Sequence, residues 1–298
     1  MTYKVIGKRV KRVEDPRLLT GEALFVGDVN LPNMLHAAFL RSDYAHARIK
    51  NIDTSQAKKI PGVVGVYTAE DMGDSWEPGP PLVSPPPTLE NVVFNSRRQV
   101  PLVKDKVKHA GEIIAVVVAE SRYIAEDAVE EISVDYEPLP AVVDLEKCME
   151  PGHTLVHDDL DSNLAAHLIQ NKGDYEAARK NADLVLKRRF HLDRGAAVAM
   201  ENRGLVVNWD QKNQHLMVWD ATQSPIPIRN GMAARLGLRT HQVRVVAPFV
   251  GGGFGPKIMM FYAEEMVLPW LTMKLNRPVK WIEDRKENFY ATTQEREQ

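Results

Sequence analysis

The stretch Val246-Ala-Pro-Phe-Val-Gly-Gly-Gly-Phe-Gly-Pro-Lys257 determines how the rest of this chain is interpreted. The apolar run 242–250 predicts a strand, and the largely apolar run 257–275, which contains Pro269, predicts a helix. The four glycines of 251–255 can adopt positive φ and bring main-chain N–H groups close to a ligand. We therefore expect a ligand-binding loop between a strand and a helix.

This loop matches neither of two familiar nucleotide-binding motifs. Gly255-Pro-Lys-Ile258 stands where a Walker A loop requires Gly-Lys-Ser/Thr, and the glycine spacing is Gly-x-Gly-x-Gly rather than Gly-x-Gly-x-x-Gly. A tight turn that packs the helix against the strand is the structural alternative to a ligand-binding loop.

Segments with strand or helix periodicity flank the loop on both sides. In chain order they are strands 35–40, 47–52 and 63–67, a buried strand 113–119, a helix 122–131 capped by Ser121, a strand 132–136, a helix from Asp174 to Asn181, a strand 184–192, a hairpin of 205–209 and 215–219, and a helix from Ser224-Pro225 to Gly237. This mixture predicts an α+β fold, in which 113–136 forms a β-α-β unit.

Composition excludes several classes of function. The 298 residues are 44% hydrophobic and 26% charged, as in ordinary globular proteins, and the net charge of -2 argues against nucleic-acid or membrane partners. The single Cys148 excludes an internal disulfide and any iron–sulfur or thiolate zinc site built from this chain alone. The N-terminus has no apolar run of signal-peptide length, so we expect a cytoplasmic protein.

Four regions follow from these patterns. Residues 1–20 are charged and predict an N-terminal arm, 21–140 an α/β domain, 141–172 a linker that contains Pro151-Gly152, and 173–298 a second α+β domain.

The histidines do not form a convincing metal site. His153 and His157 have the spacing of a helical ligand pair, but Pro151-Gly152 precedes them and no helix is predicted there. We therefore assign no protein metal ligand.

At the glycine loop the sequence closely resembles the Gly-Gly-Gly-Phe-Gly-x-Lys segment of molybdenum hydroxylase large subunits, the family of xanthine dehydrogenase, aldehyde oxidase and aerobic carbon monoxide dehydrogenase. Further matches in the same order are Arg12-Val-Glu-Asp-Pro-Arg-Leu-Leu-Thr-Gly21, Met200-Glu-Asn-Arg-Gly204 and Thr222-Gln-Ser224. The resemblance spans essentially the whole chain. It implies a hammerhead-like domain over 21–140, followed by the first part of a molybdopterin-binding domain.

The resemblance also implies a cofactor and the residues that bind it. The cofactor is molybdenum held by a pyranopterin, with or without a cytosine nucleotide, and it needs no protein ligand to the metal. In the family, the glutamine matching Gln223 donates a hydrogen bond to a molybdenum oxo group. Main chain matching Gly252, Gly253, Phe254 and Gly255 lies beside the metal centre. Taken alone, Gln223 would be interpreted as an ordinary residue before a helix start.

Glu201 is the substrate-pocket candidate, because purine-oxidising members carry a substrate-contacting glutamate at the matching position. A structural salt bridge of Glu201 with Arg203 or Arg194 is the alternative. At position 258 the purine-specific relatives have a second glutamate, whereas this chain has Ile258, which argues against a purine substrate.

The family's large subunit continues well beyond the segment matching Trp281–Gln294. No catalytic residue is assigned here, since the general-base glutamate is expected in the C-terminal half or in a partner chain. The chain alone is therefore expected to be inactive, as a natural half-subunit or as a shortened product.

The expected function is that of a molybdopterin-binding subunit, or half-subunit, of a complex that hydroxylates an aldehyde or N-heterocycle with water as oxygen source. Its expected partners are the chain with the C-terminal half, a [2Fe-2S] subunit, an FAD subunit and a small-molecule substrate. The alternatives are a noncatalytic scaffold subunit with a vestigial site, and a phosphate- or nucleotide-binding module built on 251–255.

Overall fold

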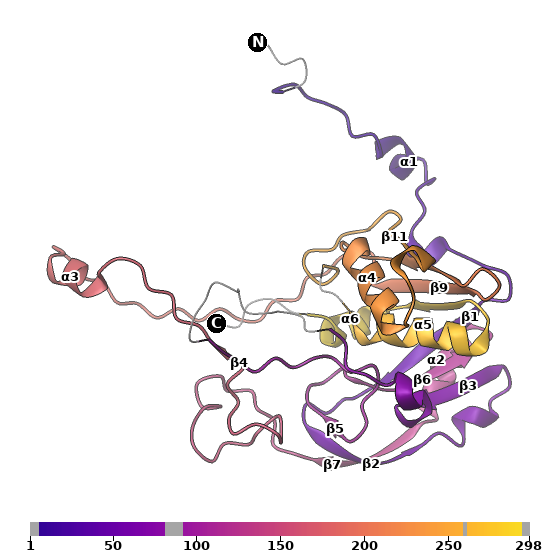
Figure 1. Ribbon diagram of the computed structural model, residues 1–298, viewed down its shortest axis with the longest axis horizontal. Helices are drawn as coiled ribbons and strands as arrows, with labels where there is room; N and C mark the ends of the chain where they lie inside the picture. The colour runs from indigo at the N-terminus through magenta and orange to yellow at the C-terminus, as the bar shows by residue number, and fades with distance from the viewer. Residues whose placement is uncertain (1–5, 81–91, 259–260, 294–298) are drawn as a thin grey trace.

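The computed structural model describes residues 6–80, 92–258 and 261–293. Its centre is a seven-stranded sheet with the order β11-β10-β9-β12-β1-β6-β3 (Figure 1). These strands are β1 (Leu35–Arg41), β3 (Val63–Thr68), β6 (Ile113–Ala119), β9 (Gly204–Asp210), β10 (His215–Asp220), β11 (Val243–Val246) and β12 (Val279–Ile282). The helices are α1 (Asp15–Leu19), α2 (Arg122–Glu130), α3 (Tyr175–Lys180), α4 (Pro225–Arg235), α5 (Ala263–Leu275) and α6 (Arg285–Ala291). The predicted α+β class is confirmed.

The central sheet passes without a break from the first part of the chain into the second. β1 and β12 pair in parallel, with Leu35 opposite Val279, and β12 in turn pairs with β9. Side chains from both parts, such as Leu35, Val116 and Leu268, belong to one hydrophobic cluster. The sheet and its core therefore hold residues from β1 to β12 in one body.

The predicted strand 113–119 and the helix after it are confirmed. Every residue of β6 is buried, since β1 and β3 flank it and both faces of the sheet are covered. α2 begins after Ser121, whose hydroxyl accepts a hydrogen bond from the N–H of Ile124 at 3.3 Å. The predicted β-α-β unit is wrong as a unit of one sheet, because β7 (Ser133–Pro138) pairs with β2 (Ala47–Asp53) in a separate sheet.

Two further small elements complete the sheets. β5 (Lys106–Val107) is the third strand of the β5-β2-β7 sheet, and β4 (Val93–Phe94) pairs with β8 (Ala166–His167). Short 3-10 turns lie at Val26–Asp28, Ala57–Lys59, Glu70–Ser75 and Thr240–Gln242. Within the described ranges, no helix combines the length and the apolar character that crossing a bilayer requires.

The second part contains the predicted hairpin and helix start. β9 and β10 are antiparallel, with Asp210 opposite His215. α4 begins with Pro225 directly after Ser224, and Gly237 has the positive φ of 64° that ends such a helix. α4 and α5 pack on the sheet near β11 and β9 (Figure 1). The hairpin and α4 therefore agree with prediction.

The strand and the helix predicted around the glycine loop are both shorter than expected. β11 ends at Val246, because the N–H of Phe249 donates to the carbonyl of Leu24 instead of continuing the ladder to β10. α5 begins at Ala263 rather than at 257, because the carboxylate of Glu265 accepts from the N–H of Tyr262 at 3.0 Å and caps the helix there. Residues 259–260 of the predicted helix lie outside the described residues. The loop therefore extends past its last glycine, Gly255, through Ile258.

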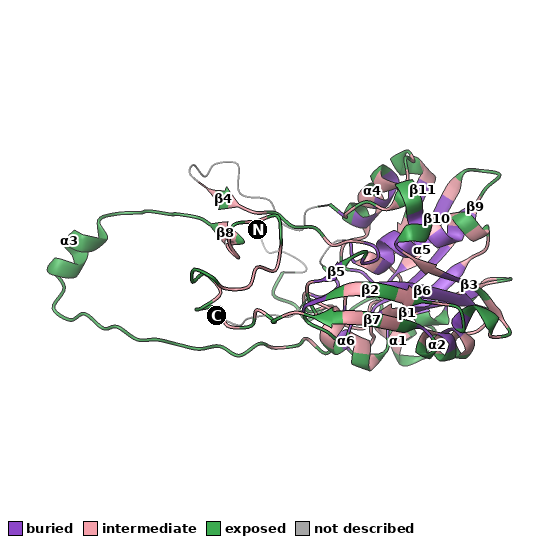
Figure 2. Cartoon of the chain, turned by 90° about the horizontal axis from the view of Figure 1, so that it is seen from below, coloured by how far each residue is buried: buried purple, intermediate pink, exposed green. Residues whose placement is uncertain are grey.

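Residues 168–192 form an arm that extends away from the sheet and carries α3 at its tip (Figure 2). Asp174 caps α3 by accepting from the N–H of Ala177 at 2.9 Å, as predicted. The predicted strand 184–192 is wrong for the chain as described here, because this segment is extended and exposed but pairs with no sheet edge among the described residues.

Candidate functional site

The glycine loop lies against two segments that are distant in sequence. A Cβ atom on Gly251 would lie 2.5 Å from Cβ of Glu201, and one on Gly253 would lie 2.1 Å from Oε1 of Gln223. Neither position can carry a side chain without displacing its neighbour. Glycine at 251 and 253 therefore allows Glu201 and Gln223 to lie directly against the loop.

The loop presents unpaired main-chain donors. Gly252, Gly255 and the exposed Phe254 have positive φ of 96°, 108° and 54°. Among the described residues, the N–H groups of 252–255 find no protein acceptor. Such a run of free N–H groups favours an oxygen-rich or anionic ligand.

Gln223 is fixed at its main chain and free at its side chain. Its N–H donates to the carbonyl of Lys257 at 2.8 Å, and the Thr222 hydroxyl donates to the same carbonyl at 3.2 Å. The Ser224 hydroxyl donates to the carbonyl of Ile258 at 3.1 Å. Within the described part of the chain, the exposed Gln223 amide makes no hydrogen bond. Gln223 therefore points a free donor and acceptor toward Gly253.

Glu201 holds the first glycine of the loop. Its Oε2 accepts from the N–H of Gly251 at 2.7 Å and from Nζ of Lys257 at 3.0 Å, and its own N–H donates to the carbonyl of Gly251 at 3.1 Å. Burial lowers the pKa of Lys257, and the charge of Glu201 opposes this change. The alternative of a salt bridge between Glu201 and Arg203 or Arg194 is wrong for Arg203, which pairs with Glu264 and Glu283 instead, and the cation that pairs with Glu201 is Lys257. Glu201 is therefore part of the loop's support, and its buried Oε1 has no partner among the described residues.

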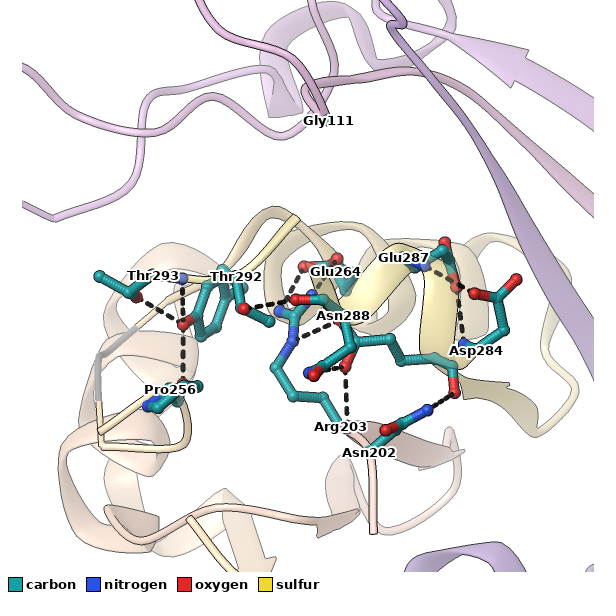
Figure 3. Close-up of polar contacts among 12 residues, drawn as sticks. Gly111, Asn202, Arg203, Pro256, Glu264, Asp284, Glu287, Asn288, Thr292 and Thr293 are labelled. Carbon is teal, nitrogen blue, oxygen red and sulfur yellow. Dashed lines mark hydrogen bonds and ion pairs between the residues drawn. The ribbon is translucent and has the colours of Figure 1, made fainter. Parts of the chain in front are cut away.

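Arg203 sits at the centre of a buried charge network (Figure 3). Its guanidinium donates to Glu283 at 2.6 and 2.9 Å and to Glu264 at 3.0 and 3.3 Å, and it lies 4.0 Å from the ring centroid of Tyr262. Arg41 of β1 also donates to Glu264, at 2.5 Å. Although burial raises the pKa of Glu264, the two arginines lower it to about 2. Because Arg203 directly precedes β9 and Glu283 directly follows β12, the network joins β1 and α5 to the ends of these two strands.

Two further carboxyl groups lie in the same buried region. Asp220, Glu265 and Lys257 line a small cavity, and the Oδ2 of Asp220 has no partner within the described ranges. Burial raises the pKa of Asp220 to about 7 and that of Glu265 well above its ordinary value. The buried region therefore favours a neutral form of these carboxyl groups.

Sequence reasoning missed this buried cluster. The sequence features that could have indicated the cluster are the acidic pair Glu264-Glu265 in an otherwise apolar helix and Asp220 at the end of a strand. By contrast, the structure brings all the predicted site residues together at the loop, namely Glu201, Gln223, Gly252, Gly253, Phe254 and Gly255. In the described part of the chain, no cluster of three or more His, Cys, Asp or Glu side chains is arranged to hold a metal ion.

Comparisons with known families identify the class of protein. Residues 20–140 match the domain described as "Aldehyde oxidase and xanthine dehydrogenase, a/b hammerhead domain", and residues 156–298 match the "Molybdopterin cofactor-binding domain". The chain belongs to the molybdenum hydroxylase family, of which it contains the hammerhead domain and at least part of the molybdopterin-binding domain.

Individual relatives support the same assignment. The chain is 37% identical over its whole length to the nicotine 6-hydroxylase large subunit of Paenarthrobacter nicotinovorans, of which it covers 36%. It is 38% identical to the carbon monoxide dehydrogenase large chain of Afipia carboxidovorans, with 97% of this chain and 36% of the relative covered. The crystal structure of quinoline 2-oxidoreductase from Pseudomonas putida 86 superposes with a TM-score of 0.90 at 38% identity. That match covers 99% of this chain and 37% of the solved chain. The chain thus spans about a third of these relatives.

Proposed function

We propose that this chain is the N-terminal part of a molybdenum hydroxylase large subunit, and that Gln223 and residues 252–255 bind a molybdenum–pyranopterin cofactor. The observation that carries the proposal is the contact between Gln223 and Gly253. It places the Gln223 amide beside the N–H groups of 252–255, and none of these groups has a partner among the described residues. These are neutral donors, which polarise an oxygen acceptor without competing for the metal. The residues present therefore fit a cofactor that needs no protein ligand.

In this proposal each group of residues has its own task. The bound cofactor supplies the two-electron oxidation, with water as the source of oxygen. Gln223 donates a hydrogen bond to an acceptor atom of the cofactor, and the N–H groups of 252–255 bind beside it. Glu201 and Lys257 hold Gly251, and thus the start of the loop, in position. The network around Arg203 keeps β9 and α5 fixed beneath them.

The substrate proposed is an aldehyde or an N-heterocycle. The side chains of Phe254 and Ile258 are 68% and 49% exposed beside the loop, where they can contact an apolar ring. Two of the relatives are named for nicotine and for quinoline, which are both N-heterocycles. Ile258 cannot donate or accept the hydrogen bonds that a purine ring would offer. In this position it favours a less polar ring.

The proposed assembly also contains the rest of a large subunit, a [2Fe-2S] subunit and an FAD subunit. We propose that the general base comes from the part of the large subunit that relatives carry beyond the matched region. The cofactor is proposed in the pyranopterin form, with or without a cytosine nucleotide. In the native assembly, 21–140 acts as the hammerhead-like domain and 173–298 as part of the cofactor domain, joined by the linker 141–172.

The test uses the native assembly purified through a tag on this chain. Metal analysis should find about one molybdenum per copy. Gln223→Ala should retain molybdenum but lower turnover about a hundredfold, since one preorganised donor is lost. The matched control is Gln211→Ala in the β9–β10 turn, an exposed glutamine whose side chain makes no hydrogen bond in the described residues. Absence of molybdenum, or equal effects of the two substitutions, would contradict the proposal.

A further inference from the structure

Residues 184–192 have the side-chain alternation of a strand that is buried on one face. Leu184, Leu186, Phe190 and Leu192 occupy the even positions together with Arg188, and the odd positions hold Val185, Lys187, Arg189 and His191. Because successive side chains of a strand point to opposite faces, four large apolar groups share one face. The sequence thus encodes a strand that needs a covered face.

Within the described residues, this segment has neither an apolar cover nor a sheet partner. The four even apolar side chains are 72%, 69%, 78% and 42% exposed, in the order of the chain. No main-chain hydrogen bond connects 184–192 to another segment among the described residues. Figure 2 shows the arm exposed along its length and separate from the buried sheet. An extended apolar edge of this kind is a template for pairing with another strand.

The arm belongs to the part of the chain that is shared with a much longer solved relative. The superposition on quinoline 2-oxidoreductase includes 99% of this chain, so the path of the arm belongs to the shared structure. The same superposition leaves about two thirds of that solved chain unmatched, because only 37% of it is covered. The arm therefore follows a path that the relative uses in the presence of much more polypeptide.

We propose that residues 184–192 become a β-strand by pairing with a sheet edge of the remainder of the large subunit, on the same or on a second polypeptide. This partner's identity rests on the proposed function above. Leu184, Leu186, Phe190 and Leu192 then pack on its apolar face. Lys187 and Arg188 complement carboxylates that flank the partner strand, whereas Arg189 already pairs with Glu146 of this chain. The positive charge of the segment keeps free copies of this edge from pairing with each other.

Hydrogen exchange tests the strand directly. In the full chain purified alone, the amides of 185–191 should exchange as fast as those of an unstructured peptide. In the native assembly they should exchange about a hundredfold more slowly, since paired strands protect their amides. Fast exchange in an intact assembly would overturn the proposal. Protection in the chain alone, with a dimeric mass, would overturn it in favour of pairing between copies.

The alternation gives a matched mutational test. Leu186→Ser and Phe190→Ser should each reduce the yield of assembly about tenfold, whereas Lys187→Ser and His191→Ser should change it less than about twofold. All four variants should leave the melting temperature of the chain alone unchanged, since these side chains are exposed there. Equal losses on the two faces would contradict a one-sided strand.

Molybdenum content separates this proposal from the proposed function. An assembly that contains molybdenum but leaves 185–191 unprotected would refute the strand and leave the cofactor site standing. An assembly in which 185–191 is protected but which lacks molybdenum would support the strand and refute the cofactor site.

Discussion

Lys257 and Glu201 form the ion pair that supports the glycine loop most directly. The Lys257 side chain is only 2% exposed and that of Glu201 is 18% exposed, so solvent screens the pair weakly. Lys257 belongs to the conspicuous glycine-loop sequence, but its partner lies 56 residues away, which no local pattern specifies. The glycine-loop motif therefore predicts the loop but not the ion pair that holds it in place.

A double-mutant cycle should measure this coupling. Glu201→Gln and Lys257→Met should each lower the free energy of unfolding by about 2–4 kcal/mol, because each leaves a buried charged group without its partner. The double variant should lose about 1–3 kcal/mol less than the sum of the two single losses. Urea unfolding provides the measurement. The control cycle is the half-exposed pair Arg122 and Glu126, with an expected coupling of about 0.5 kcal/mol. Equal coupling in the two cycles would contradict a supporting role.

Asp220 should make stability depend on pH in an unusual direction. Its pKa is raised to about 7 by burial, so the folded protein holds this proton more tightly than the unfolded chain does. The stability contributed by Asp220 is fully present below the unfolded pKa, near 4, and is lost as the pH rises through 7. Asp220→Asn should therefore be more stable than the parent at pH 8, and the difference should shrink toward pH 4.

Unfolding measured across this pH range tests the expectation. Asp210→Asn is the control, because Asp210 is only partly buried and its pKa is lowered by hydrogen bonds from Asn213. The stability that Asp210 contributes is present above its unfolded pKa, and it is lost only as the pH falls through the lower pKa of the folded state. A parallel pH dependence for the two variants would exclude the assignment to Asp220.

At the scale of elements, α5 is the part of the structure most dependent on the buried charges. Glu264 lies in its first turn and binds both Arg203 and Arg41, so it ties the helix to β9 and to β1. A helix that buries a carboxylate needs those cations, since an unpaired buried charge is strongly destabilising. α5 therefore owes its position to residues from both parts of the chain.

Removal of Arg203 should disrupt this attachment. Arg203→Met leaves Glu264 and Glu283 without their main partner and should cost about 3–5 kcal/mol of unfolding free energy. Arg244→Met on β11, at an exposed position with no polar partner among the described residues, should cost less than about 0.5 kcal/mol. The comparison is made by chemical unfolding, and similar costs would argue against a supporting network.

Elements could be predicted from the sequence where their hydrophobic pattern directly reflects their burial. β6 was predicted correctly because a strand buried on both faces is a continuous apolar run. The predicted start of α5 is wrong because the apolar Phe261 and Tyr262 are buried by packing outside the helix. The helix is capped instead by the carboxylate of Glu265 in its own first turn. Pairing of β7 with β2 depends on distant segments, which periodicity does not report.

For the candidate site, the loop and Gln223 could be predicted because they are local motifs, and the structure brings them together. Their role toward a cofactor stays a prediction. Asp220 and the network of Arg203 could not be predicted, because their chemistry arises from burial and from contacts across the sheet.

At the scale of the whole molecule, the arm lies outside the hydrophobic core, whereas the sheet holds together the two parts of the chain that the arm connects. The arm is exposed along 168–192, whereas the sheet binds strands that precede the arm to strands that follow it. A cut in the arm should therefore leave the body intact.

Limited digestion with trypsin should show this. Cleavage at Lys187, Arg188 or Arg189 should give two fragments that still elute together from a sizing column, because β1 remains paired with β12 and both contribute to one core. The fragments should separate only in denaturant. Separation in plain buffer would mean that the sheet does not hold the two parts together.

The parallel contact between β1 and β12 also constrains how the protein is made. β1 leaves the ribosome early, yet the strand that covers one of its edges is synthesised more than two hundred residues later. Until then a nascent chain presents an apolar, unpaired edge, which invites aggregation or capture by chaperones. Slow translation or early termination should therefore harm solubility before it harms any chemistry.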